Sequence, residues 1–218
     1  MTCIRLKGQT EPIAVGKIVC IGRNYLDHIR ELGNPVPEEP VLFIKPATSI
    51  LPEGGSIRIP EISNDCHHEL ELAVLIGKKA VRIRPGEAMD HVAGYGVAID
   101  LTLRDVQQRL KEKGLPWEIA KGFDTACPLS DFVPASEVAD PGNLELRLWV
   151  NAEMRQSGNT AQMMRPVAEV ISEMSRFFTL EPGDVVLTGT PAGVSAIRSG
   201  DKLKGLIEGV GMLNVQVE

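Results

Sequence analysis

Short apolar runs separated by turn residues dominate the hydrophobic pattern of this chain, which contains 21 glycines and 15 prolines. Apolar runs of this kind, bounded by turn residues, predict β-strands. We expect strands at residues 17–21, 41–44, 56–60, 67–77, 80–83, 144–150 and 185–187, and two more where apolar and polar residues alternate between 201 and 218. Residues 151–153 would form a hairpin tip, and the strand at 80–83 would pair with the one at 67–77.

A helical pattern marks fewer segments, and we expect helices at residues 25–32, 103–113 and 164–178. The first would end at Gly33, Thr102 with Asp105 would form a capping box for the second, and Pro166 would lie in the first turn of the third. No repeat, low-complexity tract or domain linker interrupts these elements. The pattern therefore predicts one α+β domain over residues 1–218, built mainly from mixed and antiparallel sheet with two or three helices.

One predicted strand carries two acids on the same face. Residues 67–77 read His-His-Glu-Leu-Glu-Leu-Ala-Val-Leu-Ile-Gly, so Glu69 and Glu71 point to one side and the intervening leucines to the other. Neighbouring carboxylates repel each other unless a cation or a proton lies between them. Asp100 follows a second apolar run at 97–99. Three hard oxygen ligands favour a Mg²⁺ or Mn²⁺ site with open positions for substrate, although a solvated acidic strand face would also fit the motif alone.

Composition and charge exclude several classes of function. The chain has 218 residues, of which 43% are hydrophobic and 24% charged, as in ordinary globular proteins with a substantial core. A net charge of −6 provides no basic surface for nucleic acid or an anionic membrane. No apolar run approaches the roughly 20 residues of a membrane span. Four widely spaced cysteines and an N-terminus without a signal-peptide pattern favour reduced thiols and a cytoplasmic location.

Three further residues could take part in chemistry. His28 and Glu31 are three apart on the first predicted helix, where the carboxylate could orient the imidazole to take a proton from water. A solvated helix surface with mixed charges fits the same spacing. Lys121 lies among small and apolar residues and could stabilise developing negative charge, or it could be exposed on a loop.

Two strand ends and one loop could bind an anion. Arg23 and Lys45 each follow a predicted strand, which places a basic side chain where an anionic substrate could reach it, although basic residues are also common on surfaces. After the strand at 185–187, residues 188–194 combine two hydroxyls with backbone N–H groups. This loop could bind a carboxylate or could simply form a tight turn.

Taken together and in this order, these segments resemble the fumarylacetoacetate hydrolase superfamily. The matching residues are Cys20 to Tyr25, Phe43 to Pro46, His68 to Val74, Gly94 to Gly96, Asp100 with Arg104 and Asp105, Lys121 to Asp124, and Leu187 to Pro191. The resemblance covers residues 17–218, after a short N-terminal extension at 1–16. The segment from Tyr25 to Glu31 looks most like the small acylpyruvase and oxaloacetate decarboxylase branch.

The resemblance implies a fold, a cofactor and a set of site residues. The fold would be the β-rich mixed-sheet fold of the family's C-terminal domain, and the protein would be a homodimer. Mg²⁺ or Mn²⁺ would be held by Glu69, Glu71 and Asp100. By the same resemblance His28 and Glu31 would activate water, Lys121 would stabilise the anion, and Arg23, Lys45, Gln107 and Thr190 would line the substrate pocket.

The activity implied by this resemblance is Mg²⁺-dependent hydrolysis of the C–C bond of acylpyruvates such as acetylpyruvate or fumarylpyruvate, through a stabilised pyruvate enolate. An α-keto acid suits the site because its keto and carboxylate oxygens can chelate one Mg²⁺. Oxaloacetate decarboxylation and keto–enol tautomerisation or isomerisation would use the same metal site and remain alternatives. A non-catalytic metal-binding member is the alternative from another class, and it would be expected to lack His28, Lys121 or one of the acids.

Overall fold

An eight-stranded mixed sheet forms the centre of the computed structural model, which describes residues 2–218. Its strands follow the order β4-β3-β15-β8-β9-β11-β5, and β12 pairs with β9. Their bounds are β3 (Lys17–Gly22), β4 (Val41–Pro46), β5 (Ile50–Pro52), β8 (Leu70–Ile76), β9 (Val92–Ile99), β11 (Cys127–Leu129), β12 (Val133–Pro134) and β15 (Val185–Leu187). The β3–β15 and β5–β11 pairs are parallel, and the other pairs are antiparallel.

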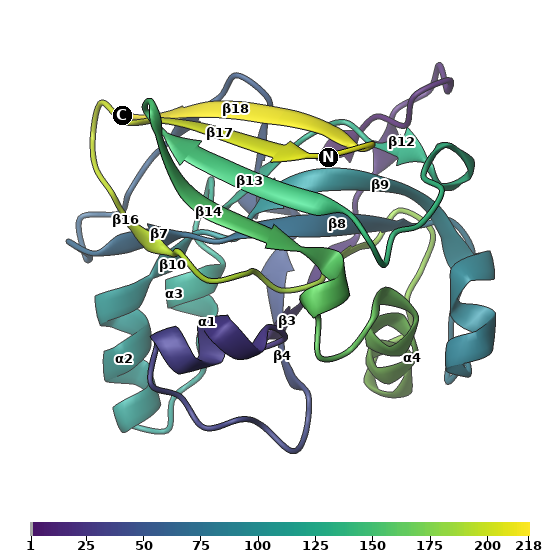
Figure 1. Ribbon diagram of the computed structural model, residues 1–218, viewed down its shortest axis with the longest axis horizontal. Coiled ribbons are helices and arrows are strands. Elements are labelled where there is room, and N and C mark those ends of the chain that lie inside the picture. Colours follow the sequence, from purple (N-terminus) through teal and green to yellow (C-terminus); the bar gives the residue numbers. More distant parts are fainter. Residues whose placement is uncertain (1) are drawn as a thin grey trace.

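A second sheet of five strands packs against β8 and β9, above them in Figure 1. Its order is β14-β13-β17-β18-β6, with bounds β6 (Ser56–Ile57), β13 (Glu145–Val150), β14 (Glu153–Asn159), β17 (Lys202–Ile207) and β18 (Gly211–Val217). Two small sheets complete the set: β7 (Cys66–His68), β10 (Thr102–Leu103) and β16 (Ser195–Ile197) in one, and β1 (Cys3–Ile4) with β2 (Ile13–Ala14) in the other. The expected β-rich mixed-sheet architecture is confirmed.

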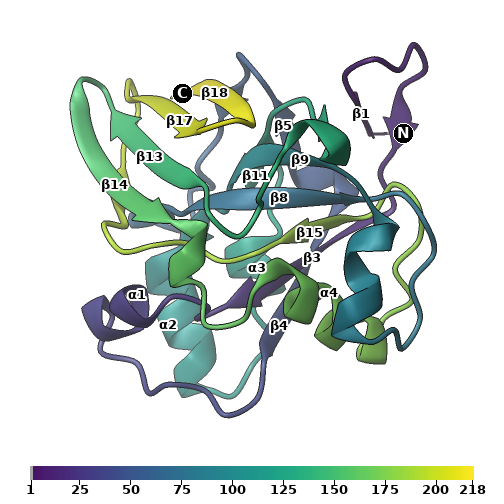
Figure 2. The same cartoon turned by 45° about the vertical axis from the view of Figure 1, so that its right-hand side comes forward.

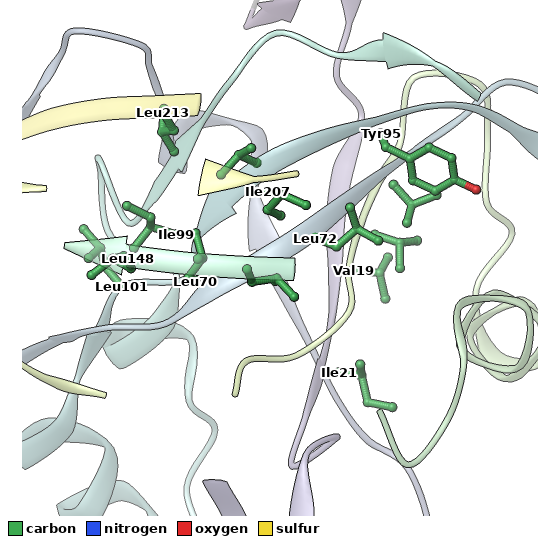
Figure 3. Packing of buried hydrophobic residues seen from close by; sticks show 14 of the residues in the cluster. Val19, Ile21, Leu70, Leu72, Tyr95, Ile99, Leu101, Leu148, Ile207 and Leu213 are labelled. Atoms are coloured by element: carbon green, nitrogen blue, oxygen red, sulfur yellow. The ribbon is translucent and has the colours of Figure 1, made fainter. Parts of the chain in front are cut away.

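Both faces of the eight-stranded sheet are buried, and the alternation of side chains along β8 shows how. Leu72 and Val74 belong to the core between the two sheets, whereas Ala73 and Leu75 belong to a second cluster on the opposite face. Figure 3 shows the first core, where Leu70 and Leu148 lie close together from the two sheets. Because side chains alternate along a strand, residues 69 and 71 share the face of Ala73 and Leu75.

The helices lie mostly below the eight-stranded sheet in the view of Figure 1. They are α1 (Leu26–Glu31), α2 (Arg104–Glu112), α3 (Glu118–Lys121) and α4 (Val167–Phe177), with 3-10 turns η1 (Ala47–Ser49), η2 (Pro85–His91), η3 (Ala135–Glu137) and η4 (Thr160–Gln162). Figure 1 shows α1, α2 and α3 together on the left and α4 on the right, and α4 packs against η2, the blue-green helical turn at the right in Figure 2. Within residues 2–218, no helix has the length and apolar character needed to cross a membrane.

The strand predicted at residues 80–83 is wrong. Ala80 makes only an isolated bridge to Leu180, and Arg82 has a positive φ of 50° that no regular strand contains. The backbone N–H groups of Arg82 and Ile83 instead bond to Ser175 near the end of α4. An apolar run alone could not reveal this docking, because its hydrogen-bond partners lie more than ninety residues away in sequence.

Two helix starts also differ from expectation. The capping box at α2 does not form: the carboxylate of Asp105 accepts from Ser63 and from the backbone N–H of Asn64 instead. Thr102 is buried, and its hydroxyl makes no hydrogen bond within residues 2–218. Pro166 precedes α4 as its N-terminal flanking residue and does not lie within its first turn.

The acid-bearing segment is two strands and not one. β7 ends at His68 in the three-stranded sheet, β8 begins at Leu70 in the eight-stranded sheet, and Glu69 lies at the junction. The short helix α3 was not expected, and it places Lys121 in its last position rather than on a loop. Both differences bring polar side chains to one end of β8.

Candidate metal centre and active site

Strand pairing brings three carboxylates together. Glu69 precedes β8, Glu71 is its second residue, and Asp100 directly follows β9, the antiparallel neighbour of β8. The pairing continues past the end of β9, since the backbone N–H of Asp100 donates to the carbonyl of Glu69 at 2.8 Å. One carboxylate oxygen from each of the three residues lies within 4.8 Å of the other two. Their exposed fractions are only 5%, 2% and 1%. The sequence-predicted triad is thus assembled in the structure.

Two cations neutralise part of this negative charge. The ammonium of Lys121 donates to Glu69 Oε2 at 2.9 Å and to Asp100 Oδ2 at 2.6 Å. The Arg104 guanidinium, from the first turn of α2, pairs with the other oxygen of Glu69. Within residues 2–218 Glu71 forms no ion pair, and its Oε2 accepts a hydrogen bond from the backbone N–H of Gly189 at 2.6 Å. Charge compensation is therefore concentrated on Glu69 and Asp100.

Lys45 lies in a different place from the one expected. We expected it to line the substrate pocket, but it is fully buried and does not line the cavity. Its ammonium donates to the carbonyls of Leu101, Lys121 and Ala126. It also lies 2.7 Å from Asp100 Oδ1, in a geometry that makes an ion pair without a hydrogen bond. Lys45 therefore supports Asp100 from inside the protein.

The pKa values follow this arrangement. Burial, together with the charges of Asp100 and Glu69, raises the pKa of Glu71 well above its usual range. Burial acts in the same direction on Glu69, but Lys121 and Arg104 outweigh it and hold the pKa of Glu69 well below its usual range. Burial alone would lower the pKa of Lys121, but Asp100 and Glu69 raise it above its ordinary value. Lys121 thus stays an ammonium, and a further cation beside Glu71 would favour the ionised form of this carboxyl.

The donor set fits a hard divalent cation. Three carboxylate oxygens lie close enough to share one ion, and Asp100 Oδ1 accepts no hydrogen bond within residues 2–218. Oxygen ligands of this kind suit Mg²⁺ and Mn²⁺, which take about six ligands and keep some for water or substrate. A divalent cation beside Glu71 would also remove the repulsion that raises the pKa of this carboxyl. The residues present therefore fit a metal at this site.

A cleft of about 440 Å³, partly open to solvent, lies over these acids. Glu69 and Glu71 line it, and so do Lys121 and His28. His28 comes from α1, and its Nδ1 lies 3.4 Å from Glu31 Oε2, so the predicted pair is present. Burial lowers the pKa of His28 despite the opposing charges of Glu69 and Glu31, which favours the neutral imidazole. Its Nε2 makes no hydrogen bond to any of the described residues.

The loop after β15 donates backbone hydrogen bonds to two carboxylates, and both belong to the protein itself. Gly189 donates to Glu71, and Gly193 donates to Glu31 Oε1 at 2.9 Å. Gly193 has a φ of +99°, and a Cβ there would lie 2.0 Å from the carbonyl oxygen of Arg155. Only glycine fits this position without moving the backbone. The loop therefore connects a candidate metal ligand to the carboxylate that orients His28.

Comparison with known proteins matches this architecture. The family model described as fumarylacetoacetate (FAA) hydrolase C-terminal matches residues 17–218. The chain belongs to the fumarylacetoacetate hydrolase family. Oxaloacetate tautomerase YcgM of Escherichia coli is 53% identical over 196 residues, which cover 89% of this chain and 90% of that protein. The mitochondrial oxaloacetate tautomerase FAHD1 of Bos taurus is 48% identical over 201 residues, which cover 92% of this chain and 91% of that protein.

Solved structures give the same result. Fumarylpyruvate hydrolase from Pseudomonas aeruginosa, in complex with Mn²⁺ and pyruvate, has a TM-score of 0.94 and 40% identity, covering 99% of this chain and 94% of that one. A fumarylacetoacetate hydrolase family protein from Yersinia pestis also has a TM-score of 0.94, with 45% identity over all of both chains. This member of the fumarylacetoacetate hydrolase family is therefore an enzyme with the family's mixed-sheet fold.

The remaining residues that the family resemblance assigned to the pocket differ in how they meet it. Arg23 lines the cleft and donates to Asn34 at 3.0 Å, and Gln107 lines it from α2. Thr190 also lines it, but its hydroxyl donates to the carbonyl of Leu70 at 2.8 Å and accepts from Gln156. Thr190 thus supports the metal-site strand, whereas Arg23 and Gln107 present polar groups to a ligand.

Several lining residues received no role from the sequence. Arg104, Phe43, Lys111 and Trp117 all line the cleft of this family member. One signal was available: Arg104, Gln107 and Lys111 are spaced i, i+3 and i+7 on the predicted helix, so they share one face. Phe43 and Trp117 offered no such signal, because their rings meet across separate elements, with centroids 6.3 Å apart.

Proposed function

We propose that this protein catalyses the keto–enol tautomerisation of oxaloacetate, with Mg²⁺ or Mn²⁺ held by Glu69, Glu71 and Asp100. The observation that carries the proposal is the ammonium of Lys121, which is bonded to two acids of the triad on the floor of a small cleft. An ammonium held in place beside a candidate metal site suits the enolate of an α-keto acid. When bound, the divalent metal would supply Lewis-acid stabilisation of negative charge on oxygen.

Lys121 would hold the enolate oxygen. Its raised pKa keeps the ammonium protonated, so it can donate a hydrogen bond as negative charge develops. Burial of this group strengthens the interaction, because the local dielectric is low. Lys121 is already positioned by Glu69 and Asp100, and little reorganisation is needed when the substrate arrives.

His28 would move the proton. Its neutral imidazole, oriented by Glu31, can take the enol hydroxyl proton at Nε2 and return a proton to C3 of the substrate. The enol O–H bond breaks and a C3–H bond forms, so the reaction is an isomerisation without net gain or loss of atoms. The similarity to the oxaloacetate tautomerases of Escherichia coli and Bos taurus supports this assignment.

Hydrolysis of acylpyruvates is the second candidate, and the His28–Glu31 pair favours it. In that reaction His28 Nε2 takes a proton from water, the oxygen attacks the distal carbonyl, and the C–C bond to the pyruvate fragment breaks. The enolate then receives the proton, which yields a carboxylic acid and pyruvate. The fumarylpyruvate hydrolase of Pseudomonas aeruginosa, solved with Mn²⁺ and pyruvate, supports this second reading.

One substrate panel separates these functions. The purified protein is given enol-oxaloacetate, acetylpyruvate or fumarylpyruvate, each with Mg²⁺, with Mn²⁺ or with a chelator. Loss of the enol's ultraviolet absorbance reports tautomerisation, and pyruvate release reports hydrolysis or decarboxylation. We expect metal-dependent loss of the enol as the fastest reaction. Faster pyruvate release from an acylpyruvate would favour hydrolysis, and no turnover of any substrate would indicate a non-catalytic binding protein.

We further propose that the chain is a single catalytic domain that works as a homodimer in the cytoplasm. Cys20, Cys66 and Cys127 are buried free thiols, which is the state expected in a reducing compartment. Light scattering coupled to size-exclusion chromatography would report the mass of the assembly. A mass near that of one chain, 23.7 kDa, would contradict the homodimer.

A further inference from the structure

Lys111 is a cation in the cleft that pairs with no anion in the described part of the chain. Its side chain lines the cavity from the last turn of α2 and is only partly exposed. Within residues 2–218 it makes no ion pair, and its ammonium lies 5.2 Å from the centroid of the Trp117 ring. A cation–π contact of this kind holds an ammonium in place without neutralising its charge.

The other cations that line the cleft each have a hydrogen-bond partner, although the partner of Arg23 carries no charge. Lys121 and Arg104 are paired with the carboxylate of Glu69, and Arg23 donates to the neutral side chain of Asn34. Burial and the like charges of Arg23, Arg104 and Lys121 lower the pKa of Lys111 to about 8. A negatively charged group in the cleft would relieve this repulsion.

One face of α2 runs along the cleft from its floor outward. Arg104, Gln107 and Lys111 all line it at i, i+3 and i+7, with Arg104 at the acidic floor and Lys111 two turns further on. Two turns correspond to roughly 10 Å along the helix axis. The ammonium of Lys111 lies beside the Trp117 ring, which also lines the cleft.

Two aromatic rings lie between the cations. The Lys121 ammonium lies 4.8 Å from the centroid of the Phe43 ring, and the Phe43 and Trp117 rings are in contact. The cleft therefore has one ammonium at the triad, an aromatic pair, and a second ammonium on the outer ring. This order matches a short molecule with an α-keto acid at one end, a carbon spacer, and a second negative charge.

We infer that Lys111 binds the second carboxylate of the substrate, so that the site selects α-keto acids with two carboxylates over those with one. The inference rests on the proposed function at the same site, and it names the substrate class. A charge-assisted hydrogen bond from an otherwise unpaired ammonium would supply the discrimination. Lys111 is thus a specificity-determining residue and has no part in the proton transfer.

Binding can be measured without turnover. Trp117 is one of two tryptophans and lines the cleft, so in a Trp149→Phe background its fluorescence reports occupancy. The Mn²⁺-loaded protein is titrated with oxaloacetate or with 2-oxobutyrate, a keto acid of equal chain length with one carboxylate. The signal is read in the first seconds after mixing. We expect oxaloacetate to bind about 10- to 100-fold more tightly than 2-oxobutyrate.

Variants at the same helix end test the residue. Lys111→Met should raise the Kd for oxaloacetate by about 10- to 100-fold. The Kd for 2-oxobutyrate should stay within about twofold of its value in the parent protein. Lys111→Arg should retain the preference, because arginine keeps the charge. Lys113→Met makes the same charge change at an exposed residue outside the cleft, and it should behave like the parent protein.

Each outcome decides the inference. Unchanged oxaloacetate binding in Lys111→Met, or equal weakening of both ligands, would overturn it. The test is separate from that of the proposed function: if the parent protein shows the preference but does not tautomerise oxaloacetate, the binding inference stands and the tautomerase proposal fails. If the enzyme turns over oxaloacetate but Lys111→Met keeps the same kcat/KM, the reverse holds.

Discussion

The floor and the mouth of the cleft are built in opposite ways. On the floor and directly beneath it, Glu69, Asp100, Lys121 and Lys45 are almost fully buried, and each of these four is paired with an opposite charge. At the mouth, Lys111 is partly exposed, and its ammonium lies beside the Trp117 ring and forms no ion pair within residues 2–218. The protein must compensate a buried charge with its own groups, whereas water solvates an exposed charge until a ligand binds. The floor is therefore suited to fixed chemistry, and the mouth to choosing the substrate.

The largest effect should come from removing Glu71, the acid of the triad that pairs with no cation among the residues described by the structure. In Glu71→Ala we expect turnover to fall by about 1000-fold, because several kcal/mol of charge stabilisation are lost with the metal. Titration with Mn²⁺, followed by electron paramagnetic resonance, should show weaker binding. Glu153→Ala, at an exposed acid on β14, is the control. Normal turnover of a folded Glu71→Ala protein would refute the ligand assignment.

Removing Lys45, which lies directly beneath the floor of the cleft, should lower the free energy of unfolding of the protein. Lys45→Met deletes the ammonium that serves three carbonyls and Asp100, and breaking a buried pair costs about 3 kcal/mol. Urea unfolding of the metal-free protein gives the difference in free energy. Lys111→Met, at the mouth, should change that free energy by less than about 0.5 kcal/mol. Equal losses in the two variants would remove the contrast between floor and mouth.

Loss of the imidazole should slow proton transfer while leaving substrate binding nearly intact. We expect His28→Ala to lower kcat by about 100-fold, the scale of general acid–base catalysis, with a smaller change in KM. Steady-state kinetics on oxaloacetate and acetylpyruvate would give both parameters. Asp27→Ala alters an exposed neighbour on α1 and serves as the control. An unchanged kcat would exclude His28 from the proton-transfer step.

The smallest effect concerns pH and the mouth alone. The pKa of Lys111 is lowered to about 8 by burial and by Arg23, Arg104 and Lys121, against the opposing charge of Glu69. Below pH 8 the ammonium is charged, and above it the charge is lost. We therefore expect kcat/KM for oxaloacetate, which reports the free enzyme, to fall several-fold as pH rises from 7 to 9. If the pH profile of kcat/KM in Lys111→Arg is identical to that of the parent protein, the fall in kcat/KM belongs to another group.

The three acids of the triad could be named from the sequence because each has a local signal, although their meeting depends on the pairing of β8 with β9. The two-residue period of a strand places Glu69 and Glu71 on one face, and the end of the neighbouring apolar run places Asp100. The same period predicted β13, β17 and β18, whose alternating side chains enter the core. Features set by nearest neighbours in sequence were thus accessible.

Features set by distant contacts were not. The orientation of Lys45 depends on carbonyls more than fifty residues away, so a strand-end lysine could not be distinguished from a pocket residue. The segment 80–83 docks through Ser175, and α3 spans only four residues, too few for a periodic signal. The aromatic pair of Phe43 and Trp117 likewise exists only through tertiary structure.

The loop after β15 holds two parts of the site by backbone hydrogen bonds. Gly189 donates to Glu71, a candidate metal ligand, and Gly193 donates to Glu31, which orients His28. A displacement of this loop would disturb ion capture and imidazole orientation in the same event. A substitution in this loop that alters the metal ligand would therefore also disturb the carboxylate that orients His28. We therefore expect evolutionary diversification of this scaffold to spare the loop and to proceed at the outer end of α2, where a new side chain changes which molecule enters.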